Sequence, residues 1–359
     1  MRIATLAIAL ALGCGSEKSG TVDGGGDGVA IDTSPDAPVG AGTRRFGVEV
    51  DQPTGFDHGV EIEKAKAIGS SAVQITFAWK GLEPTAGMRD LSFLQFAMGY
   101  YRERGVSVLL SVPTIDTVEK MFPADLMNLA MDDPQVIARL NSLFDDILAF
   151  SGAELTHLVI GNEVNIYLGP KPAVDWTQYG NLITAVSNHL EAARPAIDVG
   201  ISVSYGGLPD ARFAALTAAT DVRYVTYYFI GNDFGGSPAT NLDADFAKML
   251  DYAGDQPLVL KEFGYPTGPA TGGSEAGQLE FITKTFEVWD KHAARVPLIM
   301  FSIMFDRSRT YCEETAAYYG FPGDEAFIQF LCTLGLRTYE DQPKPAWTEL
   351  AAQSSVRGF

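Results

Sequence analysis

The sequence has few basic side chains for its length. It holds 26 Lys and Arg against 45 Asp and Glu in 359 residues, a formal net charge of −19. Residues 1–43 carry two of the basic and five of the acidic side chains, so the remainder keeps 24 − 40 = −16. Phosphate backbones are bound by clustered Lys and Arg, so this deficit argues against nucleic acid as a partner. It is compatible with a neutral ligand such as a glycan.

Metal and nucleophile motifs are also missing. The four histidines show no metal-ligand spacing, and the Asp132–Asp133 and Asp145–Asp146 pairs are typical of a helix start and a solvated helix face. No Gly-x-Ser-x-Gly elbow occurs, which weighs against an esterase. The glycine cluster at 24–28 lacks a flanking strand and helix, so a nucleotide loop is rejected. We therefore expect neither a metal nor an organic cofactor.

The N-terminal apolar run is too short to span a bilayer. Met1 and Arg2 form a basic start, and Ile3 to Leu12 form an apolar segment typical of export signals. Residues 11–14 resemble the lipobox of bacterial lipoproteins, with Cys14 as the lipidated residue, although Leu12 is bulkier than usual. An ordinary signal peptide cut nearby is the alternative. Residues 1–14 thus predict export to the cell envelope, with membrane contact through an N-terminal lipid alone, or secretion.

Residues 15–43 contain hardly any large apolar side chain. They are dominated by Gly, Asp, Ser, Pro and Thr, a composition that cannot bury enough surface to offset chain entropy. We expect a flexible tether ahead of a single catalytic domain over residues 44–359.

Cysteine is scarce, with three in the chain. If Cys14 carries lipid, Cys312 and Cys332 remain as a pair in an oxidising compartment. We expect a structural disulfide between them, with two free buried thiols as the alternative.

From residue 44 on, short apolar runs alternate with longer amphipathic stretches, the pattern of βα units. Eight such repeats predict a (β/α)8 TIM barrel rather than a doubly wound sheet. The expected strands are 45–50, 72–77, 106–112, 155–161, 199–204, 223–228, 258–262 and 298–305. The expected helices are 58–68, 91–104, 134–150, 175–193, 210–219, 242–252, 275–294 and 324–334.

Polar and aromatic residues gather at the carboxyl ends of the expected strands, where barrels carry their active sites. Glu163 follows the fourth strand and Glu262 ends the seventh, and alternation along each strand turns both toward the barrel mouth. Two facing glutamates suit glycosidic bond cleavage, since one protonates the leaving oxygen while the other attacks the anomeric carbon or activates water. The further candidates for substrate contact are Glu49, Trp79, Asn162, Asn165, Trp176, Tyr227, Tyr228 and Asp306.

These motifs resemble clan A of the glycoside hydrolases, which are retaining (β/α)8 enzymes. Asn162-Glu163 is similar to the clan's fourth-strand pair, which implies that Glu163 is the acid/base and that Asn162 holds the sugar's 2-hydroxyl. Residues 262–266, Glu-Phe-Gly-Tyr-Pro, resemble the nucleophile motif of endo-β-1,4-galactanases and β-1,3-glucanases. Residues 225–228 resemble the galactanases' Ser-Tyr-Tyr-Pro, with Tyr228 or Tyr227 as the partner of the nucleophile, but Phe229 replaces the proline.

One departure from the clan concerns the eighth strand, which lacks the tryptophan on which many clan members stack the sugar. Phe301, Phe305 or a loop aromatic would have to replace it. Trp79 and Trp176 are either sugar platforms or packing residues, Trp289 is expected in the core, and Trp347 is left open between a barrel plug and a loop residue that contacts substrate.

The glutamates themselves have a structural alternative, as buried carboxylates with Lys261 as an ion-pair partner. Likewise, His157 is expected to be a hydrogen-bonded interior histidine. The resemblance favours a retaining glycosidase, endo-acting on extracellular β-linked polysaccharide. Two rival classes are a non-catalytic glycan-binding lipoprotein on the same scaffold and a transglycosylase that uses the same carboxylate pair.

Overall fold

The computed structural model describes residues 38–50, 55–208, 210–228, 234 and 241–359. The predicted signal segment with Cys14 and most of the predicted tether lie outside the described residues. No helix within these described ranges is both long and apolar enough to cross a bilayer.

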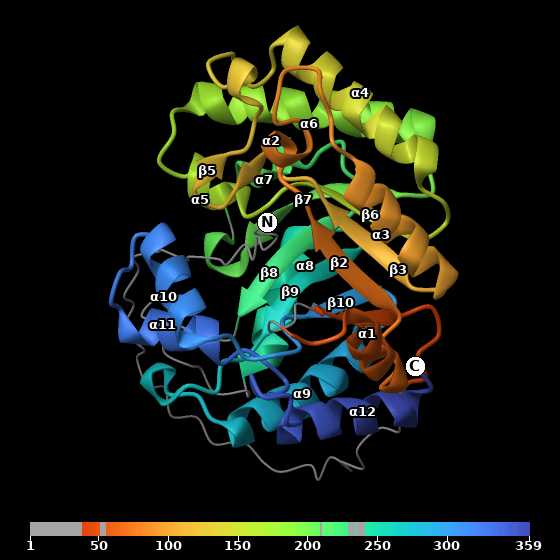
Figure 1. Cartoon of the computed structure of the whole chain (residues 1–359), viewed down its shortest axis with the longest axis vertical. Helices are drawn as coiled ribbons and strands as arrows, with labels where there is room; N and C mark the ends of the chain where they lie inside the picture. The colour runs from red at the N-terminus through yellow and green to blue at the C-terminus, as the bar shows by residue number, and fades with distance from the viewer. Residues whose placement is uncertain (1–37, 51–54, 209, 229–233, 235–240) are drawn as a thin grey trace, which may run out of the picture.

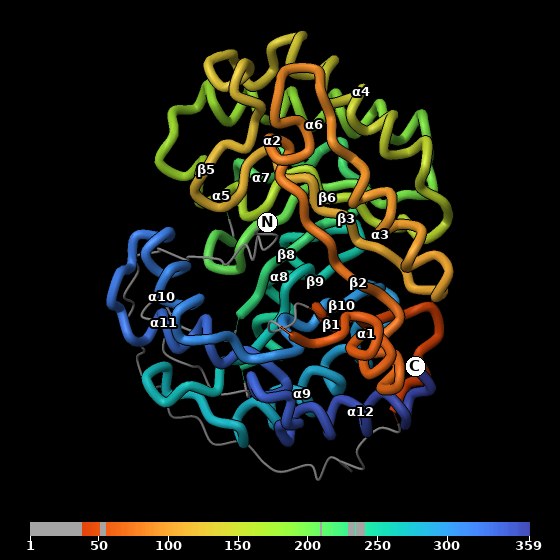
Figure 2. The backbone as a smooth tube through the Cα atoms, in the orientation of Figure 1, coloured from red at the N-terminus to blue at the C-terminus, as the bar shows by residue number. Residues whose placement is uncertain are grey.

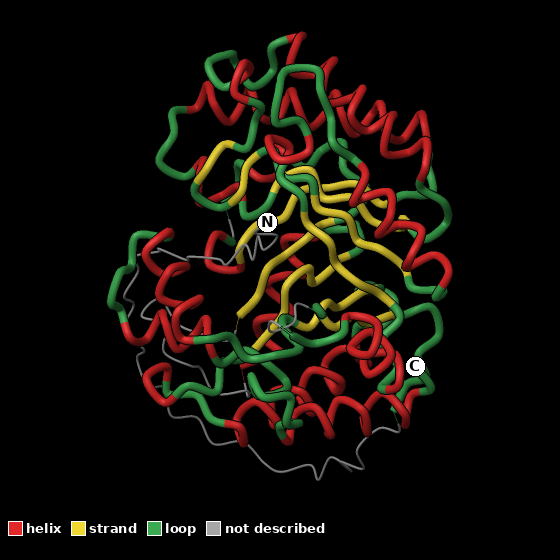
Figure 3. The backbone as a smooth tube through the Cα atoms, viewed as in Figure 1, coloured by secondary structure: helices red, strands yellow, loops and turns green. Residues whose placement is uncertain are grey.

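Eight parallel strands close into a barrel that helices surround, so the predicted (β/α)8 barrel is confirmed (Figures 1 and 3). The boundaries of the fourth and sixth strands, 155–161 and 223–228, agree with those predicted. In the order in which they pair, the strands are β1 (Arg45–Val48), β2 (Ala72–Thr76), β3 (Ser107–Ser111), β6 (Leu155–Gly161), β7 (Asp198–Ser204), β8 (Arg223–Tyr228), β9 (Leu258–Gly264) and β10 (Leu298–Phe301), which pairs with β1.

The last strand is shorter than predicted. Regular strand pairing ends at Phe301, although Ser302 still donates to the carbonyl of Phe263. Beyond it, Ile303 and Met304 accept hydrogen bonds from the backbone of Leu336 and Arg337. The apolar pattern continues to Phe305 because this segment is buried against the chain's closing residues. Burial alone therefore did not distinguish strand from buried loop.

Helices cover the outside of the barrel (Figure 3). Helix α4 begins where predicted because Asp133 caps it and Pro134 occupies its first turn. The predicted helix 210–219 is reduced to one turn, α7. The predicted helices are α1 (His58–Ala67), α3 (Ser92–Glu103), α4 (Pro134–Phe150), α6 (Ala173–Ala193), α7 (Phe213–Leu216), α8 (Leu242–Ala253), α9 (Glu275–Lys291) and α11 (Glu325–Cys332).

Several elements were not predicted. Helix α12 packs along α9 (Figure 2), and α5 follows β6 directly. They are the helices α2 (Trp79–Leu82), α5 (Val164–Leu168), α10 (Arg309–Tyr318) and α12 (Pro345–Arg357), the hairpin β4 (Ile115–Asp116) and β5 (Glu119–Lys120), and the 3₁₀ turns η1 (Ala124–Leu126), η2 (Tyr205–Gly207) and η4 (Pro269–Thr271).

Two apolar layers hold the barrel together. Inside it, Val159, Tyr224, Val259 and Met300 form a layer below the strand ends. Outside, a larger core fills the space between strands and helices. Each fully buried large apolar side chain contributes about 1.5–3 kcal/mol, so these layers fix the strand ends on which the candidate site is built.

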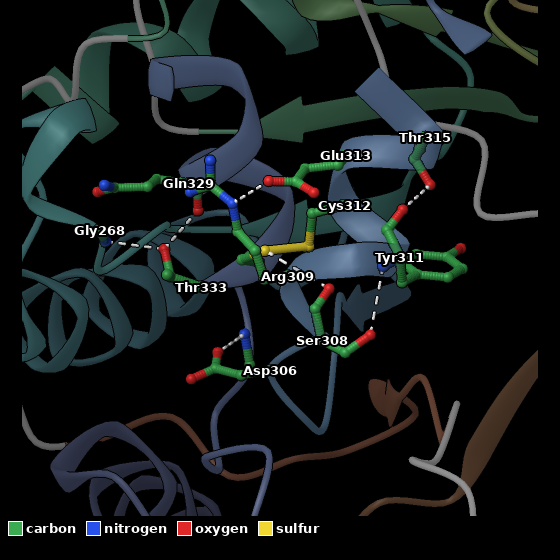
Figure 4. The surroundings of a disulfide bond; sticks show 12 residues. Gly268, Asp306, Ser308, Arg309, Tyr311, Cys312, Glu313, Thr315, Gln329 and Thr333 are labelled. Atoms are coloured by element: carbon green, nitrogen blue, oxygen red, sulfur yellow. Dashed lines mark hydrogen bonds and ion pairs between the residues drawn. A yellow bond between two sulfur atoms is a disulfide. The ribbon is translucent and has the colours of Figure 1, made fainter. Parts of the chain in front are cut away.

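Helices α10 and α11 form an excursion between β10 and α12, and the expected cysteine pair joins them. Cys312 and Cys332 form a disulfide with their Cα atoms 5.7 Å apart (Figure 4). The helix pair packs on Tyr228 at the end of β8, whose ring meets Phe330 edge-on at 5.1 Å. The disulfide thus stabilises the helix pair that packs against Tyr228, a residue of the candidate site.

Candidate active site

Glu163 lies just beyond β6, where the backbone departs from regular strand geometry. The pairing of β6 with β7 shifts by one residue between Val159 and Gly161. A side chain at Gly161 would collide with the Tyr179 hydroxyl on α6, at 2.1 Å from an ideal Cβ. Glu163 then adopts the left-handed conformation, with φ of 45°. As a result, Asn162 and Glu163 both lie at the barrel mouth. This name denotes the end of the barrel formed by the carboxyl ends of the strands.

The hairpin after β3 holds this segment in place. The backbone N–H of Asn162 donates to Ile115 at 2.8 Å, and that of Thr117 donates to Asn162 at 3.0 Å. Strand β4 therefore extends the barrel pairing beyond β6, as an isolated bridge between Asp116 and Asn162.

Glu163 is fully buried among neutral hydroxyl groups. Thr117 donates to its Oε2 at 3.0 Å, Thr226 donates to its Oε1, and its own N–H donates to Ser202 Oγ at 3.1 Å. Burial, followed by the charge of Glu262, raises the pKa of Glu163 to about 8, although the threonines and Lys261 act in the opposite direction. Glu163 is therefore protonated at neutral pH.

Glu262 is also buried, but its partners are a cation and a phenol. Lys261 Nζ contacts its Oε1 at 2.7 Å, and the Tyr228 hydroxyl donates to its Oε2 at 2.9 Å. Burial and the charge of Glu262 raise the pKa of Tyr228 well above its usual value, so Tyr228 stays a donor. The cation and the phenol thus occupy one oxygen each of the Glu262 carboxyl group.

The two glutamates share one site. Thr226, which donates to Glu163, pairs with Glu262 in the register of β8 and β9. Glu262 is also the charge that contributes most to the raised pKa of Glu163. A carboxyl group with a raised pKa beside a second one that contacts a cation and a phenol is the arrangement expected of an acid and a base or nucleophile.

The Asn162 side-chain amide contacts Lys261, Ser202 and Asp116. Its Oδ1 accepts from Lys261 at 2.8 Å and from Ser202 at 3.0 Å, while its Nδ2 donates to Asp116 Oδ1 at 3.0 Å. Burial raises the pKa of Asp116. The amide is thus held in one orientation by three neighbours.

The two tyrosine candidates are separated by strand alternation. Tyr228 faces Glu262, whereas Tyr227 faces α8 and donates to Asp245 Oδ2 at 2.5 Å. The alternative of Tyr227 as the partner of the nucleophile is therefore wrong.

Neither tryptophan candidate is a sugar platform. Trp79 is fully buried, packs on Phe122 at 5.2 Å between ring centres and donates its indole N–H to Glu83. Trp176 of α6 packs against Phe213 of α7, donates to the carbonyl of Leu168 and is covered by Arg212. Both are packing residues, the alternative to a sugar platform, because each lies on a helix and is buried instead of standing in an exposed loop.

Asn165 and Asp306 make structural contacts instead of facing the glutamates. Asn165 bonds Ser204 twice, through Nδ2 at 2.7 Å and Oδ1 at 2.8 Å, which joins α5 to the end of β7. Asp306 forms a buried ion pair with Lys344 at 2.7 Å.

Glu49 remains beside the site. It accepts from Ser302 Oγ at 3.2 Å, and its charge contributes to the raised pKa of Tyr228. Two of the aromatic residues considered as replacements for the missing eighth-strand tryptophan, Phe301 and Phe305, are buried in the core. Phe301 packs among the outer core rings, and Phe305 is buried against Phe56.

Three further expectations concern the interior. His157 lies inside the barrel, with Nδ1 within 2.8 Å of Thr156 Oγ1, and burial lowers its pKa to about 3, so it is a neutral interior histidine. Trp289 belongs to the core, as predicted, and Trp347 is buried near Arg337. In the ranges that the structure describes, no group of three His, Cys, Asp or Glu is arranged to hold a metal.

Several site residues were missed from the sequence because nothing marks a lone hydroxyl or acid as functional. Thr117 and Asp116 belong to the unpredicted hairpin. Thr226 could have been found, since it shares the inward face of β8 with Tyr228. Lys261 was assigned only as a salt-bridge partner in the structural alternative, and its contact with Asn162 was not foreseen.

Comparison with known proteins identifies relatives in structure alone. No protein-family model matches the chain, and no curated protein matches it in sequence. A GH5_18 protein from Streptomyces cattleya in complex with GlcNAc is 20% identical, with a TM-score of 0.65 over 87% of this chain and 80% of that one. A GH5_18 variant from Bifidobacterium longum in complex with Manβ1-4GlcNAc is 18% identical, with a TM-score of 0.64 over 87% and 78%.

A further similar structure is an exo-β-1,4-mannosidase from an Opitutaceae bacterium, 16% identical, with a TM-score of 0.61 over 88% of this chain and 59% of that one. What the chain shares with these proteins is the fold. At such identities the substrate does not follow from the likeness.

Proposed function

We propose that this chain is a retaining glycoside hydrolase that cleaves a β-linked glycan by double displacement. The observation that carries the proposal is the pair of buried glutamates with opposite environments, one among hydroxyl groups and one beside Lys261 and Tyr228. Glycoside cleavage needs one carboxylic acid and one carboxylate on either side of the scissile bond.

Each residue of the site has a role in this reaction. Glu163 donates its proton to the leaving oxygen while Glu262 attacks the anomeric carbon, which gives a glycosyl-enzyme ester. Glu163, now ionised, takes a proton from water, which attacks the ester and releases the sugar with its original configuration. Tyr228 orients the nucleophile, and the remaining N–H of Asn162 can donate to the sugar's 2-hydroxyl.

The substrate class is supported from two directions. The structural neighbours include a protein in complex with Manβ1-4GlcNAc and an exo-β-1,4-mannosidase, while the motif at 262–266 resembles galactanases and glucanases. The glycans named in these descriptions and family names all have β-linkages. We propose β-galactan or β-glucan chains as substrate, with endo action, and β-mannosides as the alternative that the fold neighbours favour.

The test is a panel of β-1,4-galactan, β-1,3- and β-1,4-glucan, β-mannan and short β-mannosides, with products resolved by size. Proton NMR of the first anomer formed should show the β configuration; an α-anomer would contradict double displacement. Binding without cleavage of any glycan would favour the glycan-binding class. Products longer than the substrate would favour a transglycosylase.

We also propose that the protein is an exported lipoprotein anchored through Cys14. Labelled fatty acid should be incorporated by the wild type in a bacterial host and lost in Cys14→Ser. Incorporation that persists in the variant would contradict the proposal.

A further inference from the structure

Lys261 is a buried lysine that touches two residues of the candidate site at once. Its side chain is 1% exposed, and its Nζ lies 2.7 Å from Glu262 Oε1 and 2.8 Å from Asn162 Oδ1. A lysine is rarely buried without a partner because its desolvation is costly, so this position needs a physical reason.

A local insertion in β9 brings it there. Strand alternation would turn Lys261 away from the face that Glu262 occupies. The register shows instead that Leu260 and Glu262 pair with consecutive residues of β8, and that β9 also carries one extra residue against β10. Lys261 is the extra residue against β8, and the irregularity against β10 falls at residues 261–262. Such a bulge changes the direction of a side chain, and here it places the Lys261 ammonium group beside the Glu262 carboxylate.

The ammonium group of Lys261 lies near several acidic side chains. Glu262 of β9, Glu163 after β6 and Asp116 of β4 surround it, and the charge of Lys261 lowers the pKa of the last two. Tyr228 of β8 and, near it, Glu49 just after β1 complete the surroundings. Without a cation, these buried carboxyl groups would favour taking up protons, the nucleophile included.

Lys261 also fixes which way the Asn162 amide points. An ammonium group can only donate, so it requires the amide oxygen, and Ser202 bonds the same oxygen. Asp116 can only accept when ionised and faces the amide nitrogen. The group left for a ligand is therefore an N–H donor of Asn162.

We propose that Lys261 is a positioning residue that keeps Glu262 ionised and orients Asn162 as a donor to the sugar. This inference rests on the proposed glycosidase function. It assigns to the lysine a role beyond that of a salt bridge, because both of its partners are groups that would contact substrate.

The kinetic test compares Lys261→Met with Lys261→Arg over pH. In Lys261→Met, we expect the acidic limb of kcat/KM to move to higher pH by about one unit or more, since an opposite charge at this range stabilises a carboxylate by about that much. We expect kcat to fall while KM for a good substrate changes less, and Lys261→Arg to restore the limb at least in part. An acidic limb left at the wild-type pH in Lys261→Met would overturn the proposal.

Lys344→Met provides a matched control. Lys344 is also a buried lysine, 3% exposed and 2.7 Å from Asp306, but it contacts neither glutamate. We expect this variant to lose thermal stability without moving the acidic limb. If its limb moves as far as that of Lys261→Met, the effect is one of general destabilisation and the proposal fails.

A stability cycle separates this inference from the function on which it rests. If Lys261 and Glu262 are a coupled pair, Lys261→Met should lower Tm, and adding Glu262→Gln should recover part of the loss because no unpaired buried charge remains. Recovery of Tm in the double variant, together with a wild type that cleaves no glycan of the panel, would refute the function and leave the pairing intact. A double variant no more stable than Lys261→Met would overturn the pairing itself.

Discussion

The ends of β6 and β9 present the same side chain in two different chemical settings. Glu163 and Glu262 are both buried, and both strands carry a register irregularity beside them. Hydroxyl groups surround Glu163, whose pKa rises to about 8, whereas Lys261 and Tyr228 contact Glu262. The neighbours therefore decide which glutamate holds the proton, and with it which one acts as acid.

The largest expected effect comes from removing the ionised member of the pair. Glu262→Ala should lower kcat by at least about 10⁴-fold, because no other carboxylate can form the covalent intermediate from this position. Glu103→Ala on the exposed face of α3 serves as the control. Activity within tenfold of the wild type, measured on the best glycan of the panel, would show that Glu262 is not the nucleophile.

Removing the protonated member should cost less and depend on the leaving group. Glu163→Gln should lose about 10²–10⁴-fold on a natural glycan but far less on a dinitrophenyl glycoside, whose leaving group needs no proton. In the wild type, kcat/KM should fall as pH rises above about 8, because the acid then loses its proton. The variant should lack this alkaline limb. An unchanged limb would place the titrating acid elsewhere.

A smaller effect should separate the two tyrosines of β8. Tyr228→Phe removes a hydrogen bond to a charged group, about 1.5–3 kcal/mol, so kcat should fall roughly tenfold to a hundredfold. Tyr227→Phe, which removes the bond to Asp245 on the outer face, should change kcat less than about threefold. Steady-state kinetics of the pair would contradict the account if Tyr227→Phe were the more damaging.

The smallest effect concerns stability. The folded-state pKa of Glu163 is raised from 4.5 to about 8, so its contribution to stability is full below pH 4.5 and is lost as pH rises through 8. Glu163→Gln should therefore raise Tm relative to the wild type, by a margin that grows between pH 4.5 and 8. Calorimetry that shows a constant margin over this range would argue against a protonated, buried Glu163.

The barrel and its two glutamates could be predicted from the sequence because both rest on repeated local patterns. Strand β6 and helix α4 agree with their predicted bounds, since an apolar run and a proline with its capping Asp133 define them. The irregularities could not be predicted, because strict alternation does not foresee the insertion at Lys261 or the shift before Gly161.

The neighbours of the glutamates were harder to predict than the glutamates. Thr117 depends on a short hairpin that no periodicity marks. Trp79 follows a strand as a loop residue would, yet it is buried because Phe122 and Glu83 enclose it. Such contacts join segments distant in sequence and are settled by packing rather than by local preference.

The most direct test of the division between the two glutamates is a titration that requires no substrate. Carbon-13 NMR of labelled glutamate side-chain carboxyl groups, in the wild type and in Glu163→Gln, follows each protonation separately. We predict one carboxyl signal with a midpoint near pH 8 that is absent from the variant. A wild-type spectrum in which the Glu163 carboxyl titrates near its ordinary value of 4.5 would contradict the account.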